Sequence, residues 1–365
     1  MSAPANTPVE PRGPVSWADP QREAAFARWL VRIAGAHGLA PATLRIASAD
    51  ASFRRYLRID RAATRPGSLI IMDAPPERED CRPFVKVADL MAHAGLNVPR
   101  IHEWDGALGF MLMDDLGTVT MIEAVDPDQP MANQGLYLRA VTALVTWQSA
   151  SVAGLLPEYD QALLARELSL FPDWYLQRHR GVKVEGAIRE TLDSLFKLII
   201  ERNLASPRVY VHRDFMPRNL MMPADPAEPR LGVLDFQDAV HGPVTYDIAS
   251  LMRDAFLSWD EEFVLDITVR YWQAALKAGL PVDPDFGEFY RAVEWMGLQR
   301  HLKVAGIFAR LTLRDGKPRY LADAPRFIAY IRATASRYRE LTPLLRLLDQ
   351  VEGTEPVTGY AFGRV

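Results

Sequence analysis

The segment RVYVHRDFMPRNLMM (residues 208–222) contains a short apolar run that leads directly into a His-Arg-Asp tripeptide ending at Asp214. Asn219 follows Asp214 by five positions. A second segment, LGVLDFQDAVHGPVTYDIASLMRD (residues 231–254), has a similar order, because its first apolar run ends at Asp235. The pattern predicts two short strands that deliver two carboxylates and an amide to one place.

Phosphoryl transfer requires this set of groups. One carboxylate takes the proton of the acceptor hydroxyl, while a second carboxylate and an amide oxygen hold Mg²⁺ against the ATP phosphates. We assign Asp214 as the catalytic base, and Asn219 and Asp235 as the metal ligands. Residues 212–219 fit the catalytic-loop pattern H-R-D-x-x-x-x-N. The alternative is that both aspartates only cap turns, as loop aspartates usually do. The joint pattern disfavours it.

The stretch resembles the aminoglycoside-phosphotransferase-like branch of the kinase superfamily more than the protein kinases. Asp235 is followed by Phe236-Gln237-Asp238 without the DFG glycine, and no A-P-E element follows. A helix is expected to open at Tyr246 instead. Within that branch, three phrases resemble the bacterial anomeric sugar kinases of peptidoglycan recycling, over residues 49–341: HRDFMPRNLM, LDFQDAVHGPVTYDIASLMRD and EWMGLQRHLKVAGIFARL.

The resemblance implies a two-lobed, protein-kinase-like α+β fold, with a small antiparallel-sheet N-terminal lobe and a mostly helical C-terminal lobe. It implies an enzyme that uses ATP and Mg²⁺ to phosphorylate the C1 hydroxyl of N-acetylmuramate and N-acetylglucosamine, with ATP in the cleft between the lobes. Gln237 and Asp238 are then expected beside the acceptor sugar. His212 is expected to be structural, and Asp247 to orient the loop backbone through buried hydrogen bonds.

Composition narrows the class of protein. The chain has 365 residues, which favours about two domains or lobes. Its net charge of −4 does not indicate the positively charged surface that is typical of nucleic-acid-binding proteins. The single cysteine, Cys81, excludes an intrachain disulfide and is typical of a reduced cytoplasmic protein. No apolar run approaches the length of a membrane span. We expect a cytoplasmic monomer whose partners are small molecules.

Changes in composition along the chain set the expected boundaries. The proline-rich start predicts a disordered leader, and the Gly-, Thr- and Pro-rich end predicts a loose tail. The expected parts are a leader (1–18), a nucleotide-binding lobe (19–113), a hinge (114–117), a helical catalytic and substrate lobe (118–351) and a tail (352–365).

The sequence of the nucleotide-binding lobe departs from the general kinase pattern. The expected strand at 69–72 carries no lysine for the ATP phosphates. Arg54, Arg55 and Lys86 are the candidates to replace it. The resemblance favours a phosphate loop at 48–52, in which Ser52 also donates, although a plain turn fits that stretch equally well. Hinge residues near the adenine are expected to be Met113, Asp114 and Leu116.

Helical spacing predicts long helices at 136–150, 187–203, 260–278, 285–311 and 323–341. The fourth of these contains Trp295, Gln299 and Arg300, whose aromatic, amide and guanidinium groups suit a sugar site. The alternative is a solvated helix face, and the resemblance favours the sugar site.

Three other functions stay open. A different small-molecule kinase, for aminoglycoside, choline or another sugar, shares every feature except the acceptor pocket. A protein kinase is disfavoured because no activation segment fits between Asp238 and the helix at Tyr246. The third possibility is a non-catalytic nucleotide-binding protein, which is suggested by the absence of an ATP-contacting lysine from the expected strand at 69–72.

Overall fold

The computed structural model describes residues 15–49, 54–62, 64, 66–225 and 227–353. They fall into two compact units. The first unit comprises the chain up to Val125 together with Pro217–Asp238, and the second comprises Asp126–Met216 and the chain from Ala239 onward. No helix among the described residues is long and apolar enough to span a membrane.

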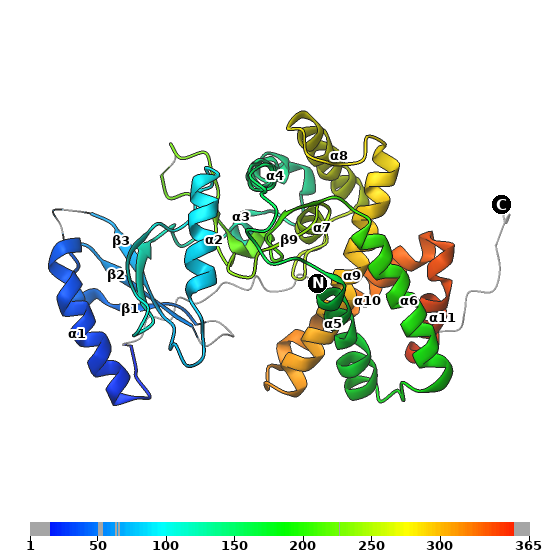
Figure 1. Ribbon diagram of the computed structural model, residues 1–365, viewed down its shortest axis with the longest axis horizontal. Helices are drawn as coiled ribbons and strands as arrows, with labels where there is room; N and C mark the ends of the chain where they lie inside the picture. The colour runs from blue at the N-terminus through cyan, green and yellow to red at the C-terminus, as the bar shows by residue number, and fades with distance from the viewer. Residues whose placement is uncertain (1–14, 50–53, 63, 65, 226, 354–365) are drawn as a thin grey trace. The chain divides into compact units, whose positions relative to one another are not determined.

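The first unit is built on an antiparallel sheet of order β1-β2-β3-β5-β4. Its strands are β1 (Arg45–Ala49), β2 (Arg55–Asp60), β3 (Ser68–Asp73), β4 (Ile101–Asp105) and β5 (Phe110–Asp114). Helix α1 (Pro20–His37) covers one face, and α2 (Arg82–His93) lies on the other (Figure 1). The predicted small antiparallel sheet is confirmed, although β1 was not expected as a strand of its own.

The core of this sheet forms because apolar side chains alternate along the strands and recur every three or four residues on the helix. From α1 come Phe26, Trp29, Leu30 and Ile33, and the strands add Leu57, Ile59, Leu69, Ile71, Phe110 and Leu112. The expected leader boundary at 18 moves toward the N-terminus, because the Trp17 ring lies 4.9 Å from that of Phe26. Residues 1–14 lie outside the described part.

Segment 217–238 joins the first unit, and not the helical lobe in which the sequence boundaries placed it. It contains η4 (Pro217–Asn219), β7 (Leu220–Met221) and β8 (Gly232–Val233). The reason is backbone pairing: Gly232 bridges to Asn97, and Met221 bridges to Thr120, next to α3 (Met121–Ala124). In addition, the Phe236 ring lies 4.8 Å from Phe84 on α2.

Gly109 closes the turn between β4 and β5, and we expect Gly109→Ala to destabilise the protein by about 2–5 kcal/mol. The residue has φ of 70°, and an added Cβ would lie 1.9 Å from the carbonyl oxygen of Ala74. Chemical denaturation measures the loss. Gly95→Ala is the matched control, because Gly95 also has positive φ but has open space around its Cβ position. Equal losses in the two variants would contradict the steric argument.

The second unit is mostly helical. Its helices are η2 (Pro130–Asn133), α4 (Gln134–Ser149), α5 (Gln161–Leu170), the π-helix η3 (Phe171–His179), α6 (Gly186–Leu204), α7 (Tyr246–Met252), α8 (Glu261–Lys277), α9 (Phe286–Leu313), η5 (Pro318–Asp323), α10 (Ala324–Arg337), η6 (Arg339–Leu341) and α11 (Thr342–Glu352). One two-stranded ribbon, β6 (Arg208–Val211) with β9 (Val240–Pro243), accompanies them. The five long helices expected from spacing are confirmed, with ends shifted by a few residues.

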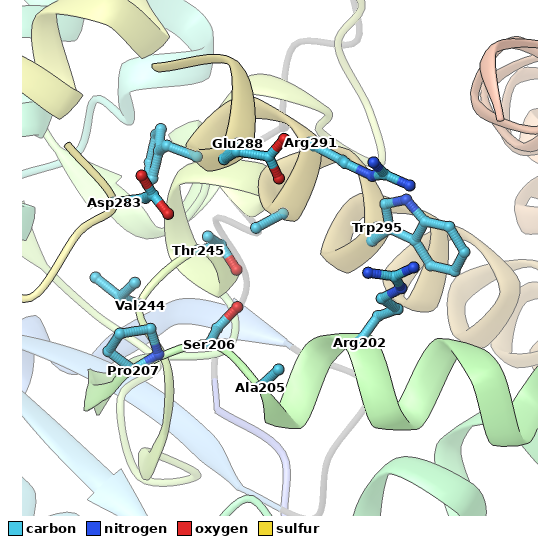
Figure 2. A pocket seen from close by; sticks show the side chains of 12 residues that line it. Arg202, Ala205, Ser206, Pro207, Val244, Thr245, Asp283, Glu288, Arg291 and Trp295 are labelled. Atoms are coloured by element: carbon cyan, nitrogen blue, oxygen red, sulfur yellow. The ribbon is translucent and has the colours of Figure 1, made fainter. Parts of the chain in front are cut away.

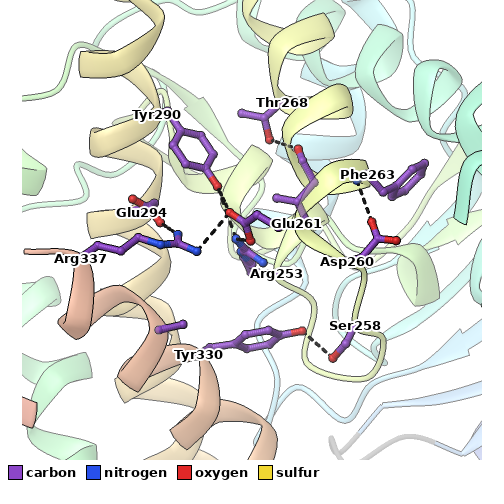
Figure 3. Close-up of polar contacts among 12 residues, drawn as sticks. Arg253, Ser258, Asp260, Glu261, Phe263, Thr268, Tyr290, Glu294, Tyr330 and Arg337 are labelled. Carbon is purple, nitrogen blue, oxygen red and sulfur yellow. Dashed lines mark hydrogen bonds and ion pairs between the residues drawn. The ribbon is translucent and has the colours of Figure 1, made fainter. Parts of the chain in front are cut away.

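Helix α9 is the centre of this unit, because it packs against α5, η3, α6, α7, α8 and α10. Ion pairs tie the neighbouring helices to it (Figure 3). Glu261 at the start of α8 accepts from Arg253 at 2.6 Å and from the hydroxyl of Tyr290 on α9, also at 2.6 Å. Arg337 at the end of α10 pairs with Glu294 on α9 and lies 3.3 Å from Glu261. These contacts set the position of α9.

Candidate active site

The loop after β6, in the second unit, carries Asp214. Its backbone turns sharply at Arg213, which has φ of 77°. A non-glycine residue in this region costs about 1–3 kcal/mol and persists only where its surroundings hold it. The surroundings are visible: the carboxylate of Asp247, at the start of α7, accepts from the N–H of His212 at 2.7 Å and from the N–H of Arg213 at 2.9 Å.

Asp247 is completely buried. Burial raises the pKa of its carboxyl to about 6, although His212, the two backbone N–H groups and Arg300 oppose the rise. His212 is also buried, and its Nδ1 accepts from the N–H of Asp214 at 3.3 Å. The position of Asp214 therefore depends on a buried aspartate and a buried histidine.

The side chain of Arg213 enters a buried cluster that sequence reasoning missed. Its guanidinium donates to Glu167 on α5 at 2.6 Å, and the Lys303 ammonium on α9 lies 2.9 Å from the same oxygen. The other carboxylate oxygen of Glu167 accepts from the hydroxyl of Tyr159 at 2.5 Å. Glu167 lies 46 positions before Arg213, and no local motif marks it.

Charge compensation explains the cluster. Burial alone would raise the pKa of Glu167, but the nearby Lys303 and Arg213 outweigh that effect and lower it. Burial would also lower the pKa of Lys303, whereas Tyr246 and Glu167 raise it. All three groups are thus held in their charged forms beside the Asp214 loop.

We expect Glu167→Gln to destabilise the protein by about 3–5 kcal/mol, because it leaves two largely buried cations, Arg213 and Lys303, without their counter-charge. Turnover is expected to fall as well, since Arg213 loses its anchor. Thermal unfolding and initial rates measure the two effects. Glu158→Gln is the control: Glu158 is largely exposed and pairs with Arg208 at 2.8 Å, so its loss is expected to cost about 1 kcal/mol or less. Similar losses in both variants would contradict the burial argument.

Asn219 and Asp235 come together in the first unit. They flank the β7–β8 hairpin, where the N–H of Leu234 donates to the carbonyl of Asn219 at 2.9 Å. The Asn219 amide lies 3.3 Å from Asp235 Oδ2, and Gln237 donates to Asp235 Oδ1 at 2.9 Å. Asp235 has φ of 63°, and it and Arg213 are the only described non-glycine residues with positive φ.

The donor set around Asp235 fits Mg²⁺. The carboxylate is exposed, the neighbouring amide supplies a second hard oxygen donor, and Oε1 of Gln237 makes no hydrogen bond within the described residues. The described residues contain no group of three or more His, Cys, Asp or Glu side chains that could hold a metal ion by themselves. A pair of protein ligands suits Mg²⁺, which usually combines one or two carboxylates with substrate phosphates and water.

The two arginines expected to contact phosphate are engaged elsewhere. Arg55 donates to Asp73 at 2.6 Å, and its guanidinium lies 4.0 Å from the ring of Trp17. Arg54 pairs with Glu79 just before α2 at 3.2 Å. The positive charge of each arginine is therefore partly neutralised by a carboxylate. Ser52 lies outside the described residues.

The hinge residues lie at and beyond the end of β5. Met113 is buried and pairs in register with Ile70 and Ile101. Asp114 accepts from His102 at 2.6 Å. Leu116 is half-buried, with its side chain beside Gly232.

The predicted sugar residues on α9 are buried. Trp295, Gln299 and Arg300 are 1%, 0% and 4% exposed, which contradicts a solvated helix face and leaves their contact with a sugar a prediction. Gln299 donates to the carbonyl of Leu164, and Arg300 lies over the ring of Tyr246. Asp238 is exposed, and Gln237 is half-buried beside Asp235. The amphipathic pattern did not show that α9 is surrounded on all sides.

Known proteins similar to this chain cover most of its length. Two relatives are named N-acetylmuramate/N-acetylglucosamine kinase. One, from Pseudomonas aeruginosa, is 52% identical over 86% of this chain and 90% of its own length. The other, from Neisseria meningitidis, is 47% identical over 87% of this chain and 94% of its own length.

Solved structures share the fold. A choline/ethanolamine kinase family protein from Mesorhizobium loti has a TM-score of 0.59 at 15% identity, covering 90% of this chain and 99% of that one. An ADP-bound aminoglycoside phosphotransferase has a TM-score of 0.56 at 13% identity, covering 86% and 97%. The two-lobed kinase-like α+β fold is thereby confirmed. Residues 43–286 match the phosphotransferase enzyme family, and the chain belongs to that family.

Proposed function

We propose that this chain is an ATP- and Mg²⁺-dependent sugar kinase that phosphorylates the C1 hydroxyl of N-acetylmuramate and N-acetylglucosamine in cell-wall recycling. The main support is the identity of 47–52% to two kinases named for these sugars, over most of both chains. We further propose that it acts as a cytoplasmic monomer.

In this proposal the loop after β6 does the acid–base work. Asp214 accepts the proton of the sugar hydroxyl as the oxygen attacks the γ-phosphorus. Asp247 holds the loop through its two backbone hydrogen bonds. The Glu167 cluster fixes the Arg213 side chain that precedes Asp214.

Asn219 and Asp235 are the proposed metal ligands. Mg²⁺ bound there would neutralise charge on the ATP phosphates. Gln237 orients Asp235 through its hydrogen bond, and with Asp238 it is the proposed contact to the acceptor sugar. Ser52, Arg54, Arg55, Met113, Asp114 and Leu116 remain the proposed nucleotide contacts.

The deciding experiment is assignment of the phosphate position by NMR on the product made from N-acetylmuramate and labelled ATP. The expected product carries phosphate on C1. A panel containing N-acetylglucosamine, choline and an aminoglycoside tests the other kinases. Phosphate at another hydroxyl, or turnover only with choline or the aminoglycoside, would refute the proposed acceptor. ATP binding without turnover of any of these compounds would favour a non-catalytic protein.

Asn219→Ala is expected to raise the Mg²⁺ concentration needed for half-maximal turnover, because the metal keeps a single protein ligand. Titration of initial rates with MgCl₂ measures this. Asn97→Ala is the control, because Asn97 lies in the same unit and its amide is 3.5 Å from the carbonyl of Arg230. An unchanged Mg²⁺ requirement in Asn219→Ala would remove that residue from the metal site.

A further inference from the structure

A cavity of about 200 Å³ lies in the second unit. Its walls come from the end of α6 and the loop that follows, from the β9–α7 junction and from the start of α9 (Figure 2). Pro207 and Val244, which line it, flank the end of the ribbon where Arg208 pairs with Pro243. Asp214 follows the opposite end of β6, about 13 Å away for a four-residue strand. The cavity is therefore distinct from the loop that carries Asp214.

The charges in this cavity are segregated. Glu288, Arg291 and Trp295 recur at helical spacing, so they line the same face of α9. Figure 2 shows Asp283 and Glu288 on one side, with Arg291 and Arg202 on the other. The cavity thus presents an acidic wall and a basic wall.

The basic wall keeps donors for a ligand. Glu340 accepts from Arg291 at 2.8 Å and lies 3.8 Å from Arg202, so it neutralises part of this charge. A guanidinium has five N–H donors, and Nε of Arg291 makes no hydrogen bond within the described part of the chain. On the acidic wall, Asp283 accepts from the N–H of Asp285 through one oxygen.

Two buried polar groups that line the cavity have no hydrogen-bond partner among the described residues. Thr245 and Trp295 are each 1% exposed, and neither Oγ1 of Thr245 nor Nε1 of Trp295 hydrogen-bonds to any described residue. An unsatisfied buried polar group costs about 1–3 kcal/mol. An indole N–H can only donate, whereas a hydroxyl can also accept. Trp295 can therefore donate to a carbonyl of a ligand, and Thr245 can accept from an N–H of a ligand.

The positions of the acidic and basic residues along α9 bear on the size of the ligand. Glu288 and Arg291 are three residues apart, an axial separation of about 4.5 Å. A dipeptide spans at most about 7 Å, and its two charges are separated by one peptide unit. A free amino acid carries both charges on one Cα, whereas a dipeptide separates them by one peptide unit and an extended tripeptide reaches about 10 Å. Separated opposite charges therefore favour the dipeptide.

We propose that this cavity binds a zwitterionic dipeptide, with its ammonium on Asp283 and Glu288 and its carboxylate on Arg202 and Arg291. The single peptide group then lies against Thr245 and Trp295. Apart from Trp295, which the sequence also suggested for the sugar, no residue proposed for phosphoryl transfer lines this cavity.

Calorimetry and NMR titration of the full chain test this with L-alanyl-L-alanine. Saturable binding is expected, and N-acetylation or C-terminal amidation of the peptide is expected to weaken it at least ten-fold. Free alanine is expected to bind more weakly than the dipeptide. No saturable binding, equal binding of the capped peptides, or displacement of the dipeptide by N-acetylglucosamine would each overturn the proposal.

Two variants locate the charges. Arg291→Gln is expected to abolish the preference for the free carboxylate over the amide. Glu288→Gln is expected to abolish the preference for the free ammonium over the acetylated form. Arg189→Gln, on the exposed surface of α6, is the control and is expected to bind as wild type. If Arg291→Gln and Glu288→Gln retain both preferences, the peptide binds elsewhere. Sugar turnover without peptide is expected to be unchanged in all three, so a failure here leaves the kinase proposal standing.

Discussion

Asp214→Asn is expected to lower the turnover of N-acetylglucosamine by about 10²–10⁴-fold, while the protein folds normally and still binds Mg·ATP. An amide has nearly the shape of a carboxylate, but it cannot take the hydroxyl proton. The backbone of the loop is held by Asp247 and His212, and these contacts do not use the Asp214 side chain. Labelled-ATP turnover and calorimetry of ATP binding measure the two properties separately.

Asp225→Asn is the matched control, because Asp225 is an exposed loop aspartate whose side chain accepts only a local N–H, from Ala227, among the hydrogen bonds seen. It is expected to turn over as wild type. Wild-type-like turnover in Asp214→Asn would remove the base assignment. Loss of ATP binding together with turnover would point to a structural role instead.

Asp247→Asn is expected to lower turnover by about ten-fold or more and to alter stability in a pH-dependent way. The carboxylate accepts two N–H groups, but an amide offers one oxygen and would turn its NH₂ toward the other N–H. A buried N–H without an acceptor costs about 1–3 kcal/mol. The strained backbone of Arg213 then lacks one of its restraints, and Asp214 loses its fixed position.

The pH dependence follows from the raised pKa of Asp247, about 6 against an ordinary value of 3.8. Between these values the folded state binds more protons at this residue than the unfolded state does. The contribution of Asp247 to the free energy of unfolding therefore falls as pH rises through that interval, by about 3 kcal/mol in total. Asp247→Asn lacks this contribution. The free energy of unfolding of the wild type minus that of the variant is therefore expected to decrease from pH 4 to pH 7.

Urea denaturation of both proteins across that range measures the difference. Asp254→Asn is the control: Asp254 is also fully buried, at the other end of α7, and accepts from the N–H of Phe256 at 2.8 Å. Turnover is expected to drop more in Asp247→Asn than in Asp254→Asn. A pH-independent difference would contradict the assigned shift, and equal turnover losses would contradict the loop-holding role.

Local patterns predicted much of the fold. The apolar runs before Asp214 and Asp235 are strands, and the long helices α4, α6, α8, α9 and α10 follow the expected spacing. These features depend on residues close together in the chain, where side-chain periodicity decides which face is buried.

Local sequence patterns could not predict which strands pair with each other. The strand before Asp214 pairs with β9 in the second unit, whereas the strand before Asp235 pairs with β7 in the first. A strand of two to four residues has little information in its own sequence about which edge it will join. Backbone hydrogen bonds from Val233 to Asn97 and from Met222 to Val119 decided the second case.

By itself, the amino-acid sequence determined the short strands, the long helices and the residue types suited to phosphoryl transfer, because these follow from spacing and side-chain chemistry. Only the tertiary structure decided that Glu167 and Lys303 surround Arg213, and that the polar residues of α9 face inward. The physical reason is that a buried charge requires an opposite charge nearby in space, and the folded chain can supply it from any distance along the sequence.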